Sequence, residues 1–396
     1  MRNGSTMSIR EISIWPNRLV SGAGSHDKLP GIIEDLGCSR AFVICGRTIA
    51  SGPLYERTVE LLGPCFAGSF TDVKMHSPLP DLTALVERIK GCEADVLISM
   101  GGGSAIDAAK GASLLLASGG DLDRYAIEYA RTGMKRDLLP KRSIAHVSIP
   151  TTAGSASEVM PTAGIRDPEK RKKMLFWDDL LIPDAVILDP HVGAFSNPRL
   201  TAMSGMTAVA RCIESLYSRD RHPISTGLAL HALRLLNRSL PICVATPSDL
   251  QAQSDAQYAC AMSGTAAINA MVSLVHAVGH AVGGRYALQH GVSHAILMAP
   301  SMRLLMPTIG EDQKLVLEAL GRNPHGMSAD AAGEAAAVEI EALLGRLPLA
   351  KRLRELGIAD EDLADIAFHT EGEYMLANLP RPVSTSEIEA LLRSCW

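Results

Sequence analysis

The sequence is poor in aromatic residues and has no excess of positive charge. Phe, Trp and Tyr make up 4% of its 396 residues, and 38 Lys and Arg against 43 Asp and Glu leave a formal charge of −5. Without a basic excess, we do not expect nucleic acid to be bound by counterion release. With 47% hydrophobic residues the chain is too apolar to be disordered. Its length favours two domains, with cores built from Ala, Leu, Ile, Val and Met.

Paired cysteines and a secretory leader are also missing. The eight cysteines are scattered without a CxxC pair, which predicts reduced thiols that fill the core. The N-terminus holds no apolar run of the kind that a signal peptide needs, so we expect a cytoplasmic protein. One stretch, 256–284, carries no formal charge and is long enough to cross a bilayer. Because it contains two histidines, Gln257 and Asn269, we expect a buried central helix and no membrane contact.

Short apolar runs alternate with amphipathic stretches in the first half of the chain. The runs predict buried strands at 41–45, 95–100, 144–150 and 185–189, with a weaker candidate at 65–70. Helical spacing occurs between them at 54–62, 79–90 and 105–117. This repetition of strand, helix and strand predicts a parallel sheet with helices on both faces.

The pattern changes after Asp189. From Leu200 to the C-terminus nearly every segment has helical periodicity interrupted by prolines, and we expect no strand there. We therefore place a domain boundary at Ser196-Asn197-Pro198. It separates an α/β nucleotide-binding domain, residues 1–197, from an all-helical domain, residues 198–396.

Three glycines follow the predicted strand at 95–100. They occupy positions 101–103, and Ser104 begins a predicted helix. Glycine allows a sharp turn and the close approach of a ligand, while the start of a helix offers unpaired N–H groups and a positive dipole end. The segment therefore predicts a diphosphate site. A tight turn with Ser104 as an ordinary N-cap is the alternative, since the spacing is not GxGxxG.

Hydroxyl side chains are concentrated at the end of the next predicted strand. Residues 149–159, IPTTAGSASEV, include Thr151, Thr152, Ser155 and Ser157. Donors at the carboxyl end of a strand can hold phosphate or ribose, and two such loops on adjacent strands strengthen that prediction. The alternative is a Ser/Thr turn that leads into a helix cap.

Patterns along nearly the whole chain resemble those of the iron-dependent, or group III, alcohol dehydrogenase family. They are GGGSxxDxAK and PTTAGSxSE at the two loops, DAVILDP at 184–190, SGMTAVARCIESLYS at 204–218, VHAVGHAVGGRYALQHG at 275–291 and the closing LPRPVSTSEIEALLRSCW. The resemblance implies a dehydroquinate synthase-like architecture, in which a dinucleotide-binding α/β domain faces an all-helical domain and NAD(P) lies in the cleft between them. It also implies an oxidoreductase with a small-molecule substrate, and a homodimer.

The same resemblance assigns the cofactor contacts. They fall on Gly101, Gly102, Gly103 and Ser104 at the pyrophosphate, and on Asp107, Thr151, Thr152, Ser155, Thr162 and Lys173. Relatives that prefer NAD tend to have Asp where this chain has Gly46, with Arg47 next. A carboxylate accepts the ribose 2′-OH and repels a 2′-phosphate, whereas Gly followed by Arg tolerates one. We therefore expect NADPH to be favoured over NADH, with use of both still open; an Arg47 that simply lies in solvent is the alternative.

Three histidines stand close together in the helical half. His276 and His280 are one helical turn apart and His290 follows a Gly-Gly pair, a pattern that by itself suits zinc or iron. Metal-dependent relatives hold the ion with an Asp-x-x-x-His segment and two further histidines, matched here by His276 and His290. In this chain Thr207 takes the Asp position and Arg211 the His position. A hydroxyl is a poor ligand and a guanidinium none at all, so we expect no catalytic metal.

The replaced ligand Asp and the segment ARCIESLYS suggest a particular branch of the family, whereas HGVSHAILMAP is more similar to the alcohol dehydrogenases and Arg211 departs from both groups. The chain resembles maleylacetate reductases, which replace the ligand Asp and reduce a conjugated double bond on a dicarboxylate. We expect Arg211 to clamp a substrate carboxylate or phosphonate, or to stabilise a developing oxyanion; a buried ion pair with Glu214 or with another acid is the structural alternative. His280 is the expected general acid, and His276 and His290 are expected hydrogen-bond donors.

The sequence thus predicts NAD(P)H-dependent reduction of a small, anionic, maleylacetate-like oxo compound without a metal. Two alternatives stay open. One is a general alcohol dehydrogenase or aldehyde reductase of the same family. The other is a catalytically silent relative that binds nucleotide, which the loss of two ligand positions favours and the retained histidines disfavour.

Overall fold

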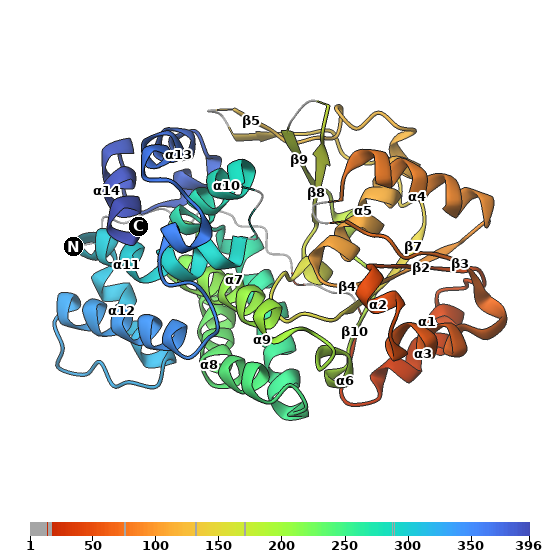
Figure 1. The fold of residues 1–396 in the computed structure, drawn as a ribbon, viewed down its shortest axis with the longest axis horizontal. Coiled ribbons are helices and arrows are strands. Elements are labelled where there is room, and N and C mark those ends of the chain that lie inside the picture. The colour runs from red at the N-terminus through yellow and green to blue at the C-terminus, as the bar shows by residue number, and fades with distance from the viewer. Residues whose placement is uncertain are drawn as a thin grey trace.

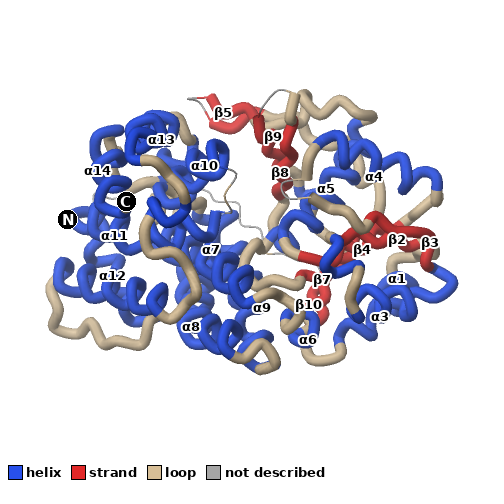
Figure 2. Tube along the Cα trace, viewed as in Figure 1, coloured by secondary structure: helices blue, strands red, loops and turns tan. Residues whose placement is uncertain are grey.

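A parallel six-stranded sheet organises the first half of the chain (Figures 1 and 2). Its strands are β1 (Leu19–Ser21), β2 (Ala41–Cys45), β3 (Phe66–Phe70), β4 (Val96–Gly101), β7 (Ala145–Pro150) and β10 (Ala185–Leu188). They lie in the order β1-β10-β7-β4-β2-β3, and each neighbouring pair is parallel. The computed structural model describes residues 14, 18–74, 77–130, 133–169, 172–286, 288 and 290–396, with the backbone alone at 129, 130, 133, 134, 172 and 173.

Helices cover both faces of this sheet. They are α1 (Leu29–Asp35), α2 (Arg47–Ala50), α3 (Pro53–Leu62), α4 (Leu79–Gly91), α5 (Gly103–Ser118) and α6 (Pro190–Gly193). Because successive side chains of a strand point to opposite faces, Val43 packs in the cluster that contains Leu29 of α1, and its neighbour Phe42 packs in the cluster that contains Leu82 of α4. The predicted parallel sheet with helices on both faces is confirmed.

Two antiparallel hairpins were not predicted. They are formed by β5 (Glu128–Ala130) with β6 (Gly133–Lys135), and by β8 (Thr162–Asp167) with β9 (Lys172–Trp177). β8 is not a continuous apolar run, because it mixes the buried Ile165 with the exposed Arg166, and such a segment gives a weak strand signal in the sequence. The β8–β9 hairpin matters for function because Thr162 and Phe176 line the cavity described below.

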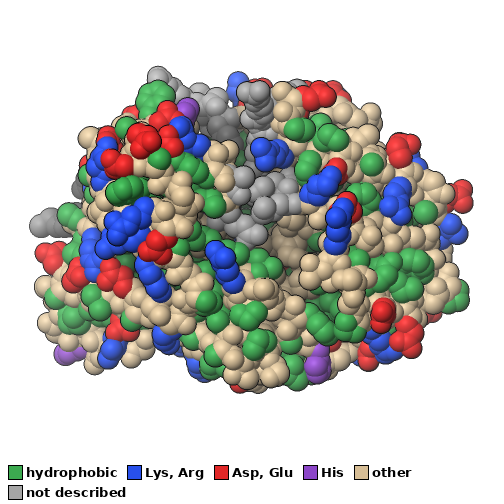
Figure 3. Space-filling model, viewed as in Figure 1, with side chains coloured by type: hydrophobic (Ala, Val, Ile, Leu, Met, Phe, Trp, Pro, Cys, Tyr) green, Lys and Arg blue, Asp and Glu red, His purple; other side chains and the backbone are tan. Residues whose placement is uncertain are grey.

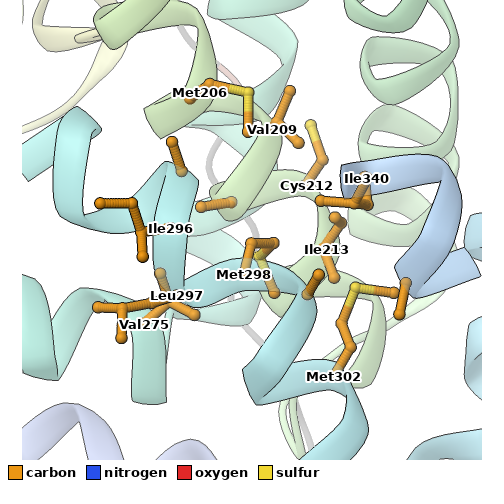
Figure 4. Packing of buried hydrophobic residues seen from close by; sticks show 14 of the residues in the cluster. Met206, Val209, Cys212, Ile213, Val275, Ile296, Leu297, Met298, Met302 and Ile340 are labelled. Atoms are coloured by element: carbon orange, nitrogen blue, oxygen red, sulfur yellow. The ribbon is translucent and has the colours of Figure 1, made fainter. Parts of the chain in front are cut away.

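The second half of the described chain is helical (Figure 2). Its helices are α7 (Pro198–Tyr217), α8 (Pro223–Ala245), α9 (Leu250–Ala270), α10 (Leu274–Tyr286), α11 (His290–Ala319), α12 (Ala329–Gly345), α13 (Leu363–Glu371) and α14 (Thr385–Cys395). Figure 4 shows aliphatic and methionine side chains of α7, α10, α11 and α12 facing one another, among them Ile213, Val275, Met298 and Ile340. The α/β half and the helical half lie side by side (Figure 1).

The predicted boundary falls at the start of α7. Asn197 caps this helix, since its side-chain oxygen accepts a hydrogen bond of 2.8 Å from the Arg199 N–H, and Pro198 is the first helical residue. On the face shown in Figure 3, Lys and Arg side chains are interspersed with Asp and Glu.

The uncharged stretch 256–284 was predicted to form one helix, but it forms parts of two helices. α9 and α10 meet at 102°, and the break begins at Met271, whose φ is +64°. Side-chain hydrogen bonds fix the bend: the Ser218 hydroxyl donates to the Ala270 carbonyl, and the Asn378 amide donates to the Val272 carbonyl at 3.1 Å. Within the described ranges no helix alone is long and apolar enough to span a membrane; α9 and α10 together meet that test on length and composition only.

A buried histidine in the sheet makes the fold sensitive to acid. His146 in β7 is 2% exposed, its Nε2 lies 2.8 Å from the Ser99 hydroxyl, and burial, followed by Lys110 and Arg142, lowers its pKa to about 3. The unfolded chain takes up this proton near pH 6.5 and the folded chain only near pH 3, so stability falls as the pH falls through that window.

We expect His146→Gln to remove about 3 kcal/mol of the loss in unfolding free energy between pH 6.5 and pH 4. Urea unfolding of the parent and the variant at both pH values measures it. Equal losses in the two proteins would assign the acid sensitivity to other groups.

Candidate active site

The glycine turn at the end of β4 leaves the start of α5 open to a ligand. Gly101 has φ +148°, and a Cβ there would lie 2.8 Å from the Cβ of Ala105. A Cβ on Gly103 would lie 3.0 Å from the Cβ of Ser155, so the turn has no room for larger residues. Gly102 is the N-cap and no side chain caps the helix. The alternative in which Ser104 is an ordinary N-cap is therefore wrong, and the first amides of α5 can bind an anion.

The hydroxyl-rich loop lies directly against this turn. The Thr151 N–H donates to the Gly101 carbonyl at 3.0 Å, and Thr152 Oγ1 lies 3.2 Å from where a Cβ of Gly102 would be. Thr151 and Thr152 are buried, whereas Ser155 is partly open. The structure thus brings together the two loops predicted to hold a dinucleotide.

Helix α5 also holds the far end of that loop. The Ser157 hydroxyl donates to Asp107 at 2.5 Å, and the fully buried Lys110 ammonium donates to the carbonyls of Ser157, Met160 and Thr162 at 2.5, 2.6 and 2.9 Å. Burial lowers the pKa of Lys110 to about 8. Lys110 is the lysine of the GGGSxxDxAK pattern, to which the sequence assigned no contact, and its three carbonyl partners make it a residue that shapes the loop.

Gly46 and Arg47 lie at the carboxyl end of β2, as predicted. Arg47 is not a free cation, because its Nε lies 2.5 Å from Asp72 Oδ1 and a terminal nitrogen donates to Asp72 Oδ2 at 2.8 Å. A 2′-phosphate therefore has to compete with Asp72 for this guanidinium. The side chain of Lys173 lies outside the described part of the chain.

A cavity of about 240 Å³ lies between the two halves of the molecule. Asp107, Ser155 and Thr162 of the α/β half line it, together with Thr207, Arg211, His276, His280 and His290 of the helical half. All four residues predicted to be catalytic, and three of those predicted to bind cofactor, thus share one cavity.

Four histidines, not three, form the cluster at this cavity. The ring centroids of His276 and His294 are 4.3 Å apart, those of His280 and His290 5.2 Å, and those of His290 and His294 6.0 Å. His294 has no exposed surface, and burial, followed by the neighbouring histidines and Arg211, holds its pKa well below the usual value. His294 is not among the residues predicted from the sequence, although it follows His290 by one turn of α11.

His276 is oriented by Glu214. The sequence suggested Glu214 only as an ion-pair partner of Arg211. The Glu214 carboxylate is fully buried and accepts a hydrogen bond from His276 Nδ1. The other ring nitrogen, Nε2, is buried without a hydrogen-bond partner among the described residues. Glu214 is thus not the acid that pairs with Arg211, although the alternative of an ion pair with another acid is not settled by this contact.

Arg211 instead holds the hydroxyl-rich loop from the helical side. Its terminal nitrogens donate to the carbonyls of Gly154 and, at 2.8 Å, Ser155, and the residue is 3% exposed. Burial raises the pKa of Glu158. The charges of Arg211 and Lys110 offset part of that rise, so both cations lie close to this carboxyl group. With both ends of its fork engaged, Arg211 is tied to the loop as well as adding positive charge to the cavity wall.

The donor set at the cavity is a poor one for a metal ion. No group of three or more His, Cys, Asp or Glu side chains arranged to hold an ion occurs in the part of the chain that the structure describes. Thr207 offers a hydroxyl that lies 3.5 Å from the Met203 carbonyl, and Arg211 offers a cation. A divalent ion beside that guanidinium would be repelled at short range.

Two family models match almost the whole chain. Residues 16–190 match iron-containing alcohol dehydrogenase, and residues 201–396 match the C-terminal region of the Fe-containing alcohol dehydrogenase family. The chain belongs to the iron-containing alcohol dehydrogenase family. It is an enzyme, a nicotinamide-dependent oxidoreductase.

Relatives in this family carry different names. The chain is 32% identical over 384 residues to maleylacetate reductase 2 of Cupriavidus pinatubonensis, covering 96% of this chain and 95% of the relative. It is 29% identical over 385 residues to an NAD-dependent methanol dehydrogenase of Bacillus methanolicus, covering 96% and 98%.

Solved structures share the fold. A maleylacetate reductase from a Rhizobium species superposes with a TM-score of 0.80 at 28% identity, covering 98% of this chain and 99% of the other. A 1,3-propanediol oxidoreductase superposes with a TM-score of 0.90 at 26% identity, covering 98% and 100%. The predicted α/β plus all-helical architecture is thereby confirmed.

Proposed function

We propose that this enzyme reduces a small anionic oxo compound of the maleylacetate type, using NADPH or NADH and no catalytic metal. One observation carries the proposal: a buried arginine, Arg211, lies in the cavity with His276 and His290, where metal-dependent relatives have a histidine ligand. The identity of 32% to a maleylacetate reductase supports the same substrate class.

The residues of the cavity fit this chemistry. The reduced nicotinamide, when bound, supplies a hydride, and the acceptor oxygen then carries negative charge. Arg211 contributes a fixed positive charge on the cavity wall, which lowers the energy of that oxyanion and attracts an anionic substrate. His276, His280 and His290 line the same cavity and are the candidates to donate the proton.

The nucleotide site fits a dinucleotide. The uncapped start of α5 suits the pyrophosphate, and Ser155 and Thr162 line the cavity where a nicotinamide would face the histidines. The absence of a carboxylate at Gly46 favours NADPH, although Asp72 offsets the charge of Arg47. A homodimer in the cytoplasm remains part of the proposal, from the family resemblance and the unpaired cysteines.

The test is nucleotide oxidation by the chelator-treated enzyme. We expect turnover of maleylacetate with NADPH, and a kcat/KM about 10- to 100-fold above that for butanal, because the positive charge of Arg211 attracts an anionic substrate. The assay follows absorbance at constant ionic strength, with NADH in parallel.

Other outcomes favour the alternatives. Activity that is lost with chelator and restored by iron or zinc, with butanal as good a substrate, indicates a general metal-dependent alcohol dehydrogenase. Tight nucleotide binding without turnover of any compound indicates a catalytically silent relative.

A further inference from the structure

The two carboxylate oxygens of Glu214 have different partners. Oε1 accepts hydrogen bonds from the Val275 N–H at 2.7 Å, the Ser273 hydroxyl at 3.1 Å and the Tyr217 hydroxyl at 3.4 Å. Oε2 accepts one hydrogen bond, from His276 Nδ1. Burial, and then the nearby Glu214 charge, raise the pKa of Tyr217, so that its hydroxyl stays protonated and able to donate.

Oε1 therefore stabilises the fold, whereas Oε2 contacts a residue of the cavity. Val275 is the second residue of α10, so Oε1 caps the start of that helix, where negative charge is stabilised by the helix dipole. Because an ionised carboxylate only accepts hydrogen bonds, Oε2 requires a proton on His276 Nδ1. The tautomer of His276 is fixed by a group outside the cavity.

We propose that Glu214 and His276 form the proton-donating pair of this reductase, with His276 as the catalytic residue and Glu214 as its positioning residue; this rests on the function proposed above. His276 is 8% exposed and lines the cavity, and its Nε2 has no hydrogen-bond partner among the residues described. A histidine that lines the cavity, and whose Nδ1 is held by a buried carboxylate, keeps its other ring nitrogen available to transfer a proton to a substrate.

The step balances with the groups named. The carbonyl carbon accepts a hydride, the C=O double bond becomes single, and the oxygen takes the proton of Nε2. His276 gives up its Nε2 proton and keeps its Nδ1 proton, which stays hydrogen-bonded to Glu214. A proton from solvent at the cavity opening restores it. For an enone the hydride goes to the β-carbon, and the same proton neutralises the enolate.

The neighbouring histidines are less suited to this role. His280 Nδ1 lies 3.5 Å from Glu373 Oε2, and both side chains are more than 20% exposed, so that this contact orients the ring less firmly. His294 is buried behind His276, with no hydrogen-bond partner for either nitrogen among the described residues. The structure thus favours His276 over His280, the residue expected from the sequence to be the acid.

Glu214→Gln separates the two oxygens. The three donors at Oε1 hold the amide oxygen in that position, so the cap of α10 is kept and the amide NH₂ faces His276 Nδ1. Nδ1 must then accept, the ring proton moves to Nε2, and the charge that stabilises the doubly protonated ring is gone. We expect kcat to fall about 100- to 1,000-fold, with substrate KM and nucleotide Kd within about threefold of the parent. Glu87→Gln, on the exposed surface of α4, is the matched control.

A second readout does not depend on activity. Nitrogen-15 NMR of labelled histidine, with His276→Gln to assign the signal, should show the neutral ring protonated at Nδ1 in the parent and at Nε2 in Glu214→Gln. An unchanged tautomer or an unchanged kcat overturns the inference. A variant that changes only in KM and stability also overturns it, because loss of a purely structural helix cap would have that effect.

The outcomes also separate this inference from the proposed function. If the parent enzyme turns over maleylacetate and Glu214→Gln is fully active, only the proposed proton-donating pair is refuted. If the parent enzyme shows no turnover, the proposed function is refuted, and the pair is refuted with it even where the tautomer is as expected. Should Glu214→Gln fail to fold, His276→Gly decides: added imidazole restores turnover if His276 is the donor and leaves it unchanged if not.

Discussion

Replacing Thr207 by Asp together with Arg211 by His is expected to create a metal site in this enzyme. The two positions are one helical turn apart on α7 and line the same cavity as His276 and His290. The change removes a buried cation and supplies a carboxylate and an imidazole, which completes the ligand set that the sequence resemblance implies for metal-dependent relatives. After loading with zinc and desalting, we expect about one equivalent of zinc per chain, bound roughly 100-fold more tightly than by the parent.

The single variant Thr207→Asp is the control, because it keeps the guanidinium that repels the ion. Elemental analysis and competition with a zinc-binding dye measure content and affinity. A folded double variant that holds no zinc would show that the cavity as a whole, and not only positions 207 and 211, is unsuited to a metal ion. One equivalent of tightly bound metal in the parent would overturn its proposed metal independence.

The features that the sequence predicted well depend on local chemistry. The strands, the glycine turn and the hydroxyl-rich loop each follow from a continuous run of residues whose types suit one backbone conformation. Adjacency in the sheet then brought the turn and the loop together, because the carboxyl ends of neighbouring parallel strands meet at one edge.

The partners inside the site could not be predicted in the same way. Glu214 and His276 are 62 residues apart, and their contact depends on the break between α9 and α10. The uncharged stretch of sequence gives no sign of this break. An unbroken helix was expected there, and the positive φ of Met271 has no signature in the sequence, since Met rarely adopts it. The candidate partners of Arg211 from the sequence were a substrate anion or oxyanion, Glu214, or another acid. Its guanidinium instead donates to main-chain carbonyls, which no residue pattern identifies.

Replacing Arg211 by Met is expected to destabilise the enzyme and to weaken nucleotide binding. The carbonyls of Gly154 and Ser155 lose their donors, and the buried Glu158 loses one of its two nearby cations. Removing one member of such a buried charged network lowers the unfolding free energy by about 3–5 kcal/mol. Because Ser155 packs against Gly103, a loosened loop should also raise the nucleotide Kd by about tenfold.

Arg211→Lys separates the charge from the fork. Lys keeps the positive charge but cannot donate to both carbonyls with one planar group. If the charge recognises the substrate, Arg211→Lys retains the preference for maleylacetate over butanal while its nucleotide Kd rises. Arg211→Met then loses the preference and also binds nucleotide weakly. If Arg211 only ties the loop to α7, both variants bind nucleotide weakly and both keep the parent's preference. Unfolding curves with kcat/KM for the two substrates therefore decide whether Arg211 only ties the loop to α7 or also recognises the anionic substrate by its charge.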